Sequence, residues 1–195
     1  MRQYDAIIVG TGQSGVPLAD HLAEQGKTVA IIERHKVGGS CVNYGCTPSK
    51  TLIASAKIAH HIRRAADFGI HAGDVRVDYP AVIARVREIV SGSNGRITRR
   101  FEKNAQITLI RAEARFTGSA DGMHTIQAGD HTLQAPQVFI NTGTRAQTPP
   151  INGLDSVPYL DSESIFDLET LPAHLICIGG GYVALELGQA YRRLG

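Results

Sequence analysis

The sequence has few cysteines, little net charge and no long apolar run. Three cysteines in 195 residues are too few for a disulfide scaffold, so a close pair among them suits catalysis in a reducing compartment better. The net charge of +2 gives no basis for nucleic-acid or membrane binding. No apolar run approaches the ~20 residues that a membrane-spanning helix needs, and the N-terminus lacks a signal-peptide core. We therefore expect a cytoplasmic protein.

The most informative segment is Gly38–Lys50, which reads GGSCVNYGCTPSK. Cys41 and Cys46 are five positions apart, and Thr47 and Pro48 then form a helix-start signal, with threonine as the cap and proline at the first helical position. Cys46 is therefore expected just outside a helix N-terminus, whose partial positive charge favours a thiolate. With a second thiol nearby, this pattern predicts a redox-active disulfide.

Two other interpretations of the cysteine pair remain open. A structural zinc site usually spaces its cysteines by two to four residues and needs a second ligand pair. The third cysteine, Cys177, lies far along the chain in an apolar run, where we expect a small core residue. The other alternative is a pair of inert buried thiols. We assign no metal ligand.

The N-terminal pattern is that of a dinucleotide-binding βαβ unit. An apolar run over residues 4–9, typical of a buried parallel strand, leads into the loop Gly10–Gly15, which reads GTGQSG. A helical pattern over 16–25 and an apolar strand over 27–32 follow. Because the glycine pattern has this full context, it is stronger evidence than a lone motif.

Each loop position has an expected task. Gly10 makes the tight turn, Gly12 lets the backbone approach a pyrophosphate, and Gly15 allows close packing of helix and strand. Ser14 lies where the helix N-terminus offers N–H groups to phosphates. Glu33 follows the second strand, about 20 residues on, as the acceptor for ribose hydroxyls. The loop alone fits FAD or NAD, but the dithiol that follows favours a flavin.

With both motifs in view, the chain resembles the class I pyridine nucleotide–disulfide oxidoreductases, which include glutathione reductase, dihydrolipoamide dehydrogenase and mercuric reductase. The family's redox motif usually reads GGTCVNVGCVPSK, and this chain departs from it at Ser40, Tyr44 and Thr47. The wording of the motif is most similar to the mercuric-reductase-like branch. The resemblance implies FAD, NADH or NADPH, a homodimeric full-length protein, and a disulfide, metal ion or other small molecule as substrate.

The resemblance also implies residue roles. Cys46 matches the flavin-proximal thiol that forms the charge-transfer thiolate, and Cys41 matches the interchange thiol that attacks the substrate. Lys50 matches a lysine near the reactive edge of the flavin, although its spacing alone would suit a surface helix residue. The other positions that match contacts to FAD are Ser40, Glu113, Ala114, Thr142 and Gly143. Asn141 and Ala146 depart from the usual alanine and proline and leave the local turn open.

The middle of the chain alternates helical and strand patterns. We predict a helix over 51–66, a loop over 67–77, and a long helix from Asp78, as cap, to about Lys103, weakened at residues 91–95. Strand patterns then cover 107–110, 112–116, 124–127, the region of 132–133, and 137–140, with turns predicted at Gly118, Asp121–Gly122 and Gly129–Asp130. Except for the last, these strands suggest an antiparallel meander inserted in a parallel-sheet domain.

A second glycine-rich segment lies near the C-terminal end. Residues 175–178 form an apolar run, which we predict to be a strand, and Gly179–Ala184 then lead into a helix to about Leu194. By resemblance this loop binds NADH or NADPH through Gly179 and Gly181. Tyr182 matches a tyrosine over the nicotinamide pocket, and Glu186 matches the acid that pairs with the lysine equivalent to Lys50. An ordinary surface charge is the alternative for Glu186.

Together these features predict an α/β protein. It has a Rossmann-like FAD-binding domain with a parallel sheet and an antiparallel β-meander insertion at 1–150. Residues 151–195 form a linker and the first βα unit of a second dinucleotide-binding domain. The expected activity is transfer of electrons from NAD(P)H through FAD to a Cys41–Cys46 disulfide and on to a disulfide or metal-ion acceptor. We also expect the chain to be part of a longer protein. The alternative is a truncated, non-catalytic FAD-binding or interaction fragment.

Overall fold

The computed structural model describes all residues from 1 to 195, and they form two compact units. Unit 1 contains Met1–Asn43 and Gly92–Arg145, and unit 2 contains Tyr44–Ser91 and Ala146–Gly195. The predicted division at residue 150 concerns functional domains and stays a prediction. No helix combines the length and the apolar character needed to cross a bilayer.

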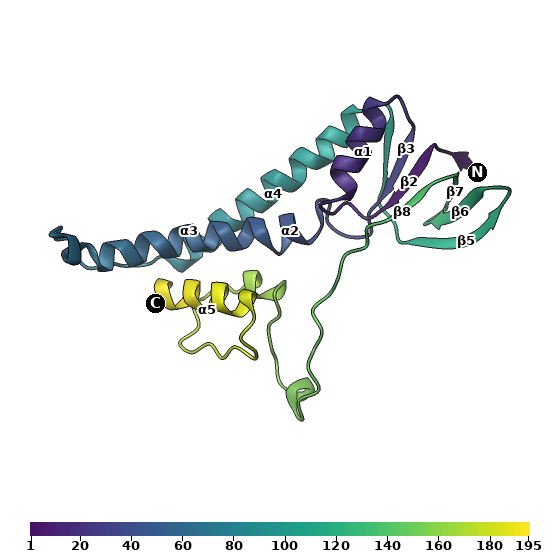
Figure 1. Cartoon of the computed structure of the whole chain (residues 1–195). Helices are drawn as coiled ribbons and strands as arrows, with labels where there is room; N and C mark the ends of the chain where they lie inside the picture. The colour runs from purple at the N-terminus through teal and green to yellow at the C-terminus, as the bar shows by residue number, and fades with distance from the viewer. The chain divides into compact units, whose positions relative to one another are not determined.

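A parallel four-stranded sheet forms the centre of unit 1. Its order is β4 (Ile107–Ile110), β3 (Val29–Ile32), β2 (Ala6–Val9) and β8 (Val138–Ile140). All four residues of β3 and the first three of β2 are buried, as expected for central parallel strands. Helix α1 (Gly15–Glu24) connects β2 to β3 and packs its apolar face on the sheet (Figure 1). The predicted Rossmann-like arrangement is confirmed.

A second sheet in unit 1 contains the predicted meander. Strands β5 (Ala114–Ala120), β6 (Met123–Ala128) and β7 (His131–Ala135) pair antiparallel, and the short β1 (Arg2–Gln3) joins β7 in parallel. The predicted turn at Asp121–Gly122 is present with φ angles of 52° and 75°, the left-handed pair that a two-residue hairpin favours. The assignment of 107–110 to the meander is wrong, because this strand pairs in parallel with β3.

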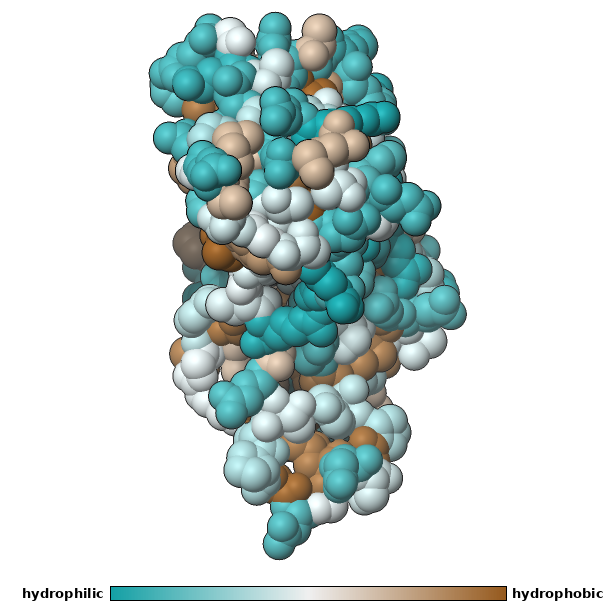
Figure 2. Space-filling model, turned by 90° about the vertical axis from the view of Figure 1, so that its right-hand side faces the viewer, coloured by the Kyte–Doolittle hydropathy of each residue, from teal (hydrophilic) through white to brown (hydrophobic).

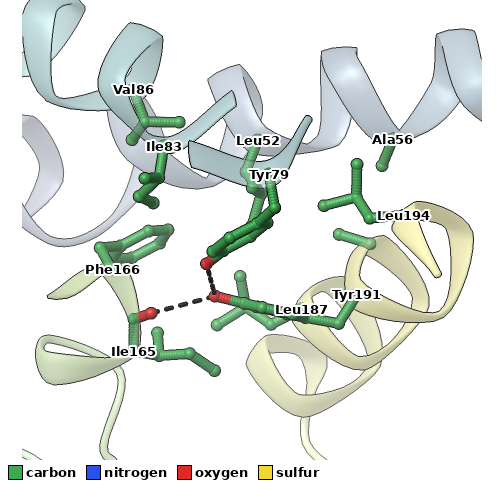
Figure 3. Close-up of a cluster of buried hydrophobic side chains, with 11 residues drawn as sticks. Leu52, Ala56, Tyr79, Ile83, Val86, Ile165, Phe166, Leu187, Tyr191 and Leu194 are labelled. Carbon is green, nitrogen blue, oxygen red and sulfur yellow. Dashed lines mark hydrogen bonds between the residues drawn. The ribbon is translucent and has the colours of Figure 1, made fainter. Parts of the chain in front are cut away.

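Unit 2 consists of helices and turns. They are α3 (Cys46–Arg63), η1 (Ala65–Phe68), the N-terminal part of α4 (Tyr79–Lys103), η2 (Leu154–Ser156), η3 (Ser164–Asp167) and α5 (Tyr182–Leu194). Their core contains Leu52, Ala56, Ile83, Val86, Phe166, Leu187 and Leu194. Within it, the Tyr191 hydroxyl donates to the Ile165 carbonyl at 3.0 Å and lies 3.0 Å from the Tyr79 hydroxyl (Figure 3).

Helix α4 begins and ends as predicted. The Asp78 carboxylate accepts a hydrogen bond from the Ala81 N–H at 3.1 Å, which confirms the cap. The helix runs unbroken through the small residues at 91–95. Asn94 explains part of this continuity, because its amide donates to the Val37 carbonyl at 2.7 Å and to Asn43 Oδ1 at 3.1 Å. A long-range contact therefore offsets the weak local propensity.

The strand predicted at residues 175–178 is wrong, because this segment has no regular structure. A parallel strand needs a neighbour for its N–H and C=O groups, and neither sheet includes a strand beside this one. Ile176 and Ile178 are 78% and 57% exposed. On the face shown in Figure 2, brown apolar residues lie in separate groups among hydrophilic ones.

Candidate functional site

The candidate nucleotide site lies at the carboxyl ends of the parallel strands in unit 1. The glycine loop Gly10–Gly15 follows β2, Glu33 follows β3, and Asn141 follows β8. The chain moves from β2 to β3 on one side, whereas β8 pairs with β2 on the other. This reversal is a topological switch point, where open α/β sheets bind ligands. The three sequence-predicted strand ends are therefore brought to one edge.

The glycine loop leaves no room for a side chain at Gly10 or Gly15. Gly10 has a φ of 104°, and a Cβ atom added there would lie 2.1 Å from the Asn141 carbonyl oxygen. A Cβ atom at Gly15 would lie 2.3 Å from the Gly10 carbonyl oxygen. Both glycines are therefore required by backbone approach. Ser14 precedes α1 with an exposed side chain that makes no capping hydrogen bond.

Glu33 faces the loop and is held there by backbone and side-chain donors. Thr11 donates to Glu33 Oε2 through its N–H at 3.1 Å and its hydroxyl at 2.6 Å. The His35 N–H donates to Oε1 at 2.8 Å. A carboxylate has about four acceptor positions, so one remains for a ligand hydroxyl.

Asn141 is a loop contact that the sequence analysis left undecided. Its Nδ2 donates to the Gly10 carbonyl at 3.3 Å, and its N–H donates to the Val9 carbonyl at 2.8 Å. The amide also lies 3.3 Å from where a Cβ atom of Gly12 would be. The substitution of asparagine for the family's usual alanine therefore joins the end of β8 to the glycine loop. In the sequence, the asparagine at a position where the family usually has alanine was the feature that could have indicated this contact.

Ser40 and Cys41 lie on a short helix that the sequence analysis missed, α2 (Gly39–Asn43). Ser40 is exposed and Cys41 is half-exposed. The buried Asn43 amide at the end of α2 donates to the carbonyls of Lys36, Val37 and Gly39. The helix thus follows a loop that its own last side chain holds closed.

The segment before α2 contacts the glycine loop directly. Gly38 and Gly39 have φ angles of 103° and 64°, and a Cβ atom at Gly39 would lie 2.5 Å from Gly12 Cα. The Gly38 N–H also donates to the Thr11 hydroxyl oxygen at 3.0 Å. The start of the cysteine motif is therefore packed against the phosphate loop within unit 1.

In unit 2, Cys46 is the first residue of α3, with Gly45 at the cap position. The prediction of a threonine cap at Thr47 with proline at the first position is wrong by two residues, because Gly45 already provides the non-helical turn. Cys46 is an exposed, free thiol. No acidic residue lies in the first turn, so no side chain neutralises the positive end of this helix.

Lys50, also on α3, forms an ion pair with Glu186 of α5. The Nζ–Oε1 distance is 2.5 Å, with side chains 63% and 39% exposed. An exposed pair of this kind contributes at most about 1 kcal/mol to stability. The pairing inferred from the resemblance is therefore present, while the position of the pair beside a flavin stays a prediction.

The second glycine loop is open. Gly179 has a φ of 99°, and added Cβ atoms at Gly179 and Gly181 would meet no atom within 4 Å. Tyr182, the first residue of α5, is 79% exposed. Cys177 is exposed as well, so the expectation of a core residue is wrong, because the strand that would bury it is not formed.

The remaining predicted contacts lie in unit 1. Ala114 begins β5 and is half-buried, whereas Thr142 and Gly143 follow β8 and are exposed. Glu113 lies 3.9 Å from Arg34 Nη1 in an exposed ion pair. No group of three or more His, Cys, Asp or Glu side chains is arranged to hold a metal ion.

Comparison with known proteins identifies the group to which this chain is related. Residues 4–195 match the family described as Pyridine nucleotide-disulphide oxidoreductase. A mercuric reductase from Streptomyces lividans is 36% identical over 203 residues, which cover 98% of this chain and 41% of the relative. A dihydrolipoyl dehydrogenase from Cupriavidus necator is 35% identical, with coverage of 100% and 43%.

A solved structure agrees with these relatives. The Cu(II) complex of the HOCl-induced flavoprotein disulfide reductase RclA from Escherichia coli has a TM-score of 0.83 and 30% sequence identity to this chain. The match covers 97% of this chain and 40% of that one, so the chain spans about two fifths of the length of these relatives. The chain belongs to the pyridine nucleotide–disulphide oxidoreductase family.

Proposed function

We propose that this chain is the N-terminal portion of a flavin-dependent disulfide oxidoreductase. Electrons pass from NADH or NADPH through FAD to a Cys41–Cys46 disulfide, and from there to a disulfide or to a metal ion such as Hg²⁺. The observation that carries the proposal is the contact of Gly39 with Gly12, because it joins the segment that bears Cys41 to the predicted pyrophosphate loop.

The residues of unit 1 fit a dinucleotide. The loop presents backbone without side chains at Gly10, Gly12 and Gly15, and the first turn of α1 contains no acidic residue that would repel phosphate. Glu33 keeps one acceptor position for a ribose hydroxyl. Ser40, Ala114, Thr142 and Gly143 supply further FAD contacts in this proposal. Bound FAD would supply two-electron exchange between the nicotinamide and the thiols.

The two thiols have separate tasks. Reduction of the Cys41–Cys46 bond takes two electrons and two protons and leaves two thiol groups, of which Cys46 is the first residue of α3. Cys41 then attacks a disulfide acceptor, breaks its S–S bond, releases one of its two thiols and forms a mixed disulfide with the other half. Cys46 displaces the acceptor's second thiol and restores the Cys41–Cys46 bond, so that the two electrons leave with the acceptor.

Unit 2 supplies the remaining groups. Lys50, oriented by Glu186, is a fixed positive charge for the flavin side of the reaction. Gly179 and Gly181 would offer backbone to the pyrophosphate of NADH or NADPH, and Tyr182 would contact the nicotinamide. The two relatives compared above differ in the acceptors that their names state, so the acceptor is best identified by direct competition between Hg²⁺ and lipoamide as substrates of the full-length protein.

The disulfide is tested by oxidation of the chain with oxidised glutathione, followed by alkylation and peptide mass spectrometry. We expect a linked Cys41–Cys46 peptide and an alkylated Cys177. The Cys177→Ser variant is the matched control, because it removes an exposed thiol outside the motif and should leave the linked peptide unchanged. Alkylation of both motif cysteines after oxidation would contradict the proposal.

The flavin is tested by reconstitution with FAD. A yellow protein whose long-wavelength thiolate–flavin absorption disappears in the Cys46→Ser variant, and persists in Cys177→Ser, supports the assigned order of the thiols. Persistence of that absorption in Cys46→Ser refutes it. A chain that takes up no FAD favours a non-catalytic fragment instead.

A further inference from the structure

Thr11 occupies a position in the glycine loop to which the motif itself assigns no task. Its side chain is completely buried, with 0% exposure. Its hydroxyl oxygen accepts from the Gly38 N–H at 3.0 Å, so its one proton is donated to Glu33 Oε2, 2.6 Å away. The direction of both hydrogen bonds follows from the chemistry, because an amide only donates and a carboxylate only accepts.

These bonds decide which oxygen of Glu33 is available. Oε2 already accepts two donors, the N–H and the hydroxyl of Thr11. Oε1 accepts one, the His35 N–H. With about two acceptor positions per carboxylate oxygen, the open position is on Oε1. The Thr11 hydroxyl therefore adds to two backbone donors, and the three together leave Glu33 with one free acceptor position, on Oε1.

The same hydroxyl fixes the start of the cysteine motif. Gly38 and Gly39 adopt left-handed φ angles, which their neighbours must hold in place because glycine itself is flexible. The bond from Gly38 to Thr11 and the contact of Gly39 with Gly12 restrain this point together with the bond from the Asn43 amide to the Gly39 carbonyl. Loss of the hydroxyl leaves the buried Gly38 N–H without this acceptor.

We propose that Thr11 is a positioning residue that couples nucleotide recognition to the redox segment. One buried hydroxyl orients Glu33 toward the ribose of an adenine nucleotide and anchors Gly38 at the entrance to α2. The ribose part of this inference rests on the proposed FAD-binding function. The anchoring of Gly38 is a property of the chain alone.

The test compares Thr11→Val, which keeps the shape but removes the hydroxyl, with Thr11→Ser, which keeps the hydroxyl. Thr28→Val is the matched control, because the Thr28 N–H and hydroxyl both donate to Asp5 Oδ2, at 2.7 and 2.8 Å. Thr28→Val thus removes a hydroxyl-to-carboxylate bond and keeps the backbone one, as Thr11→Val does, but at an exposed site outside the loop. ADP and 2′,3′-dideoxy-ADP are the probes, and calorimetry measures their binding to the full chain.

We expect loss of the ribose hydroxyls to weaken ADP binding about tenfold in the wild type, in Thr11→Ser and in Thr28→Val, as for a hydrogen bond to a charged group. In Thr11→Val the loss should be at most about twofold, because Glu33 is then held less firmly, by the backbone N–H groups of residues 11 and 35 alone. Amide exchange of Gly38, followed by NMR without nucleotide, should become about fivefold faster only in Thr11→Val.

The outcomes separate this proposal from the proposed function. Equal ADP preference and equal Gly38 exchange in Thr11→Val and the wild type overturn the role of Thr11 while FAD binding stands. A wild type that binds ADP and its dideoxy form equally removes the ribose role of Glu33, and with it the coupling. A wild type that binds neither nucleotide overturns the flavin-binding function itself together with the coupling, whatever Gly38 exchange shows.

Discussion

Replacement of Tyr191 by phenylalanine is expected to destabilise the chain about three times as much as the same change at Tyr79. Both rings are buried in unit 2, 3% exposed each, and their hydroxyls are 3.0 Å apart. Since Tyr191 donates its one proton to the Ile165 carbonyl, Tyr79 must be the donor between the two hydroxyls. The relay therefore has a direction, from Tyr79 to Tyr191 to Ile165.

That direction sets the magnitudes. Tyr79→Phe removes one hydrogen bond and leaves only an unfilled lone pair on Tyr191, at a cost of roughly 1 kcal/mol. Tyr191→Phe leaves two buried groups without this partner, the Tyr79 hydroxyl and the Ile165 carbonyl. At about 1–3 kcal/mol for each unsatisfied group, the expected cost is roughly 3 kcal/mol.

The double variant makes the reasoning sharper. On the Tyr191→Phe background, Tyr79→Phe removes an unsatisfied donor, so it should cost nothing or restore stability. The double variant should then be destabilised by about 2 kcal/mol relative to the wild type, which is about 2 kcal/mol less than the sum of the two single changes. A simple loss of packing would not produce this coupling, because neither change removes a carbon atom.

Urea unfolding followed by far-UV circular dichroism measures the four free energies of unfolding. Equal m-values are required, since they show that the variants expose the same surface on unfolding. Additive costs, or a larger cost for Tyr79→Phe than for Tyr191→Phe, would falsify the directed relay.

Three further predictions concern stability. Burial, followed by the hydrogen bond with Tyr79, raises the pKa of Tyr191. The protonated Tyr191 hydroxyl therefore stabilises the folded chain below pH ~10, and this contribution is lost as the pH rises above that value. In urea titrations at alkaline pH, the difference in free energy of unfolding between the wild type and Tyr191→Phe should shrink by about 1.4 kcal/mol per pH unit, and a constant difference would contradict this. Asn94→Ala should lower stability by about 1.5 kcal/mol even after the gain in helix propensity. Gly92→Ala should raise stability by about 1 kcal/mol, because no atom lies within 4 Å of the new methyl group. Thermal melts in which both variants change stability in the same direction would exclude this account of α4. Gly15→Ala should lower stability by about 2 kcal/mol because the new methyl group overlaps backbone atoms, and Gly181→Ala should lower it by less than about 1 kcal/mol. Equal losses of stability in thermal melts would mean that the two loops are packed alike.

Local signals predicted the elements whose ends are set by nearby residues. The Asp78 cap, the turn at Asp121–Gly122 and the glycine loop after β2 are each encoded within a few positions of the chain. The central strands β2, β3 and β8 were also predicted from apolar runs bounded by turn residues, although the same pattern at 175–178 forms no strand.

Long-range partners were not predictable in the same way. Asn94 is a poor helix former in a weak sequence, and its two hydrogen bonds reach back 57 and 51 positions. The Tyr79–Tyr191 pair spans 112 positions. No local pattern specifies such contacts, which is why a predicted weak point in α4 proved to be an anchor for the segment before α2.

The candidate site shows the same division. The motif predicted a ribose acceptor at Glu33 from its position after β3, but it does not specify how the side chain is oriented. The side chain is oriented in part by Thr11, at a variable position of the motif. The Thr11 hydroxyl can donate to Glu33 only because β2 and β3 pair side by side.

The two glycine-rich loops show that such a motif does not preform a site by itself. Gly10 and Gly15 are confined because β2 is paired on both sides, which brings the Asn141 carbonyl and the loop's own backbone within 2.3 Å of any added Cβ atom. The second loop is also rich in glycine, but the surroundings of Gly179 and Gly181 are open, because the residues before them do not pair with any strand. The sheet, rather than the glycines, converts a permissive segment into a closely packed loop. The proposed nucleotide binding at the second loop therefore requires a strand that pairs with residues 175–178, whereas the proposed binding at the first loop does not.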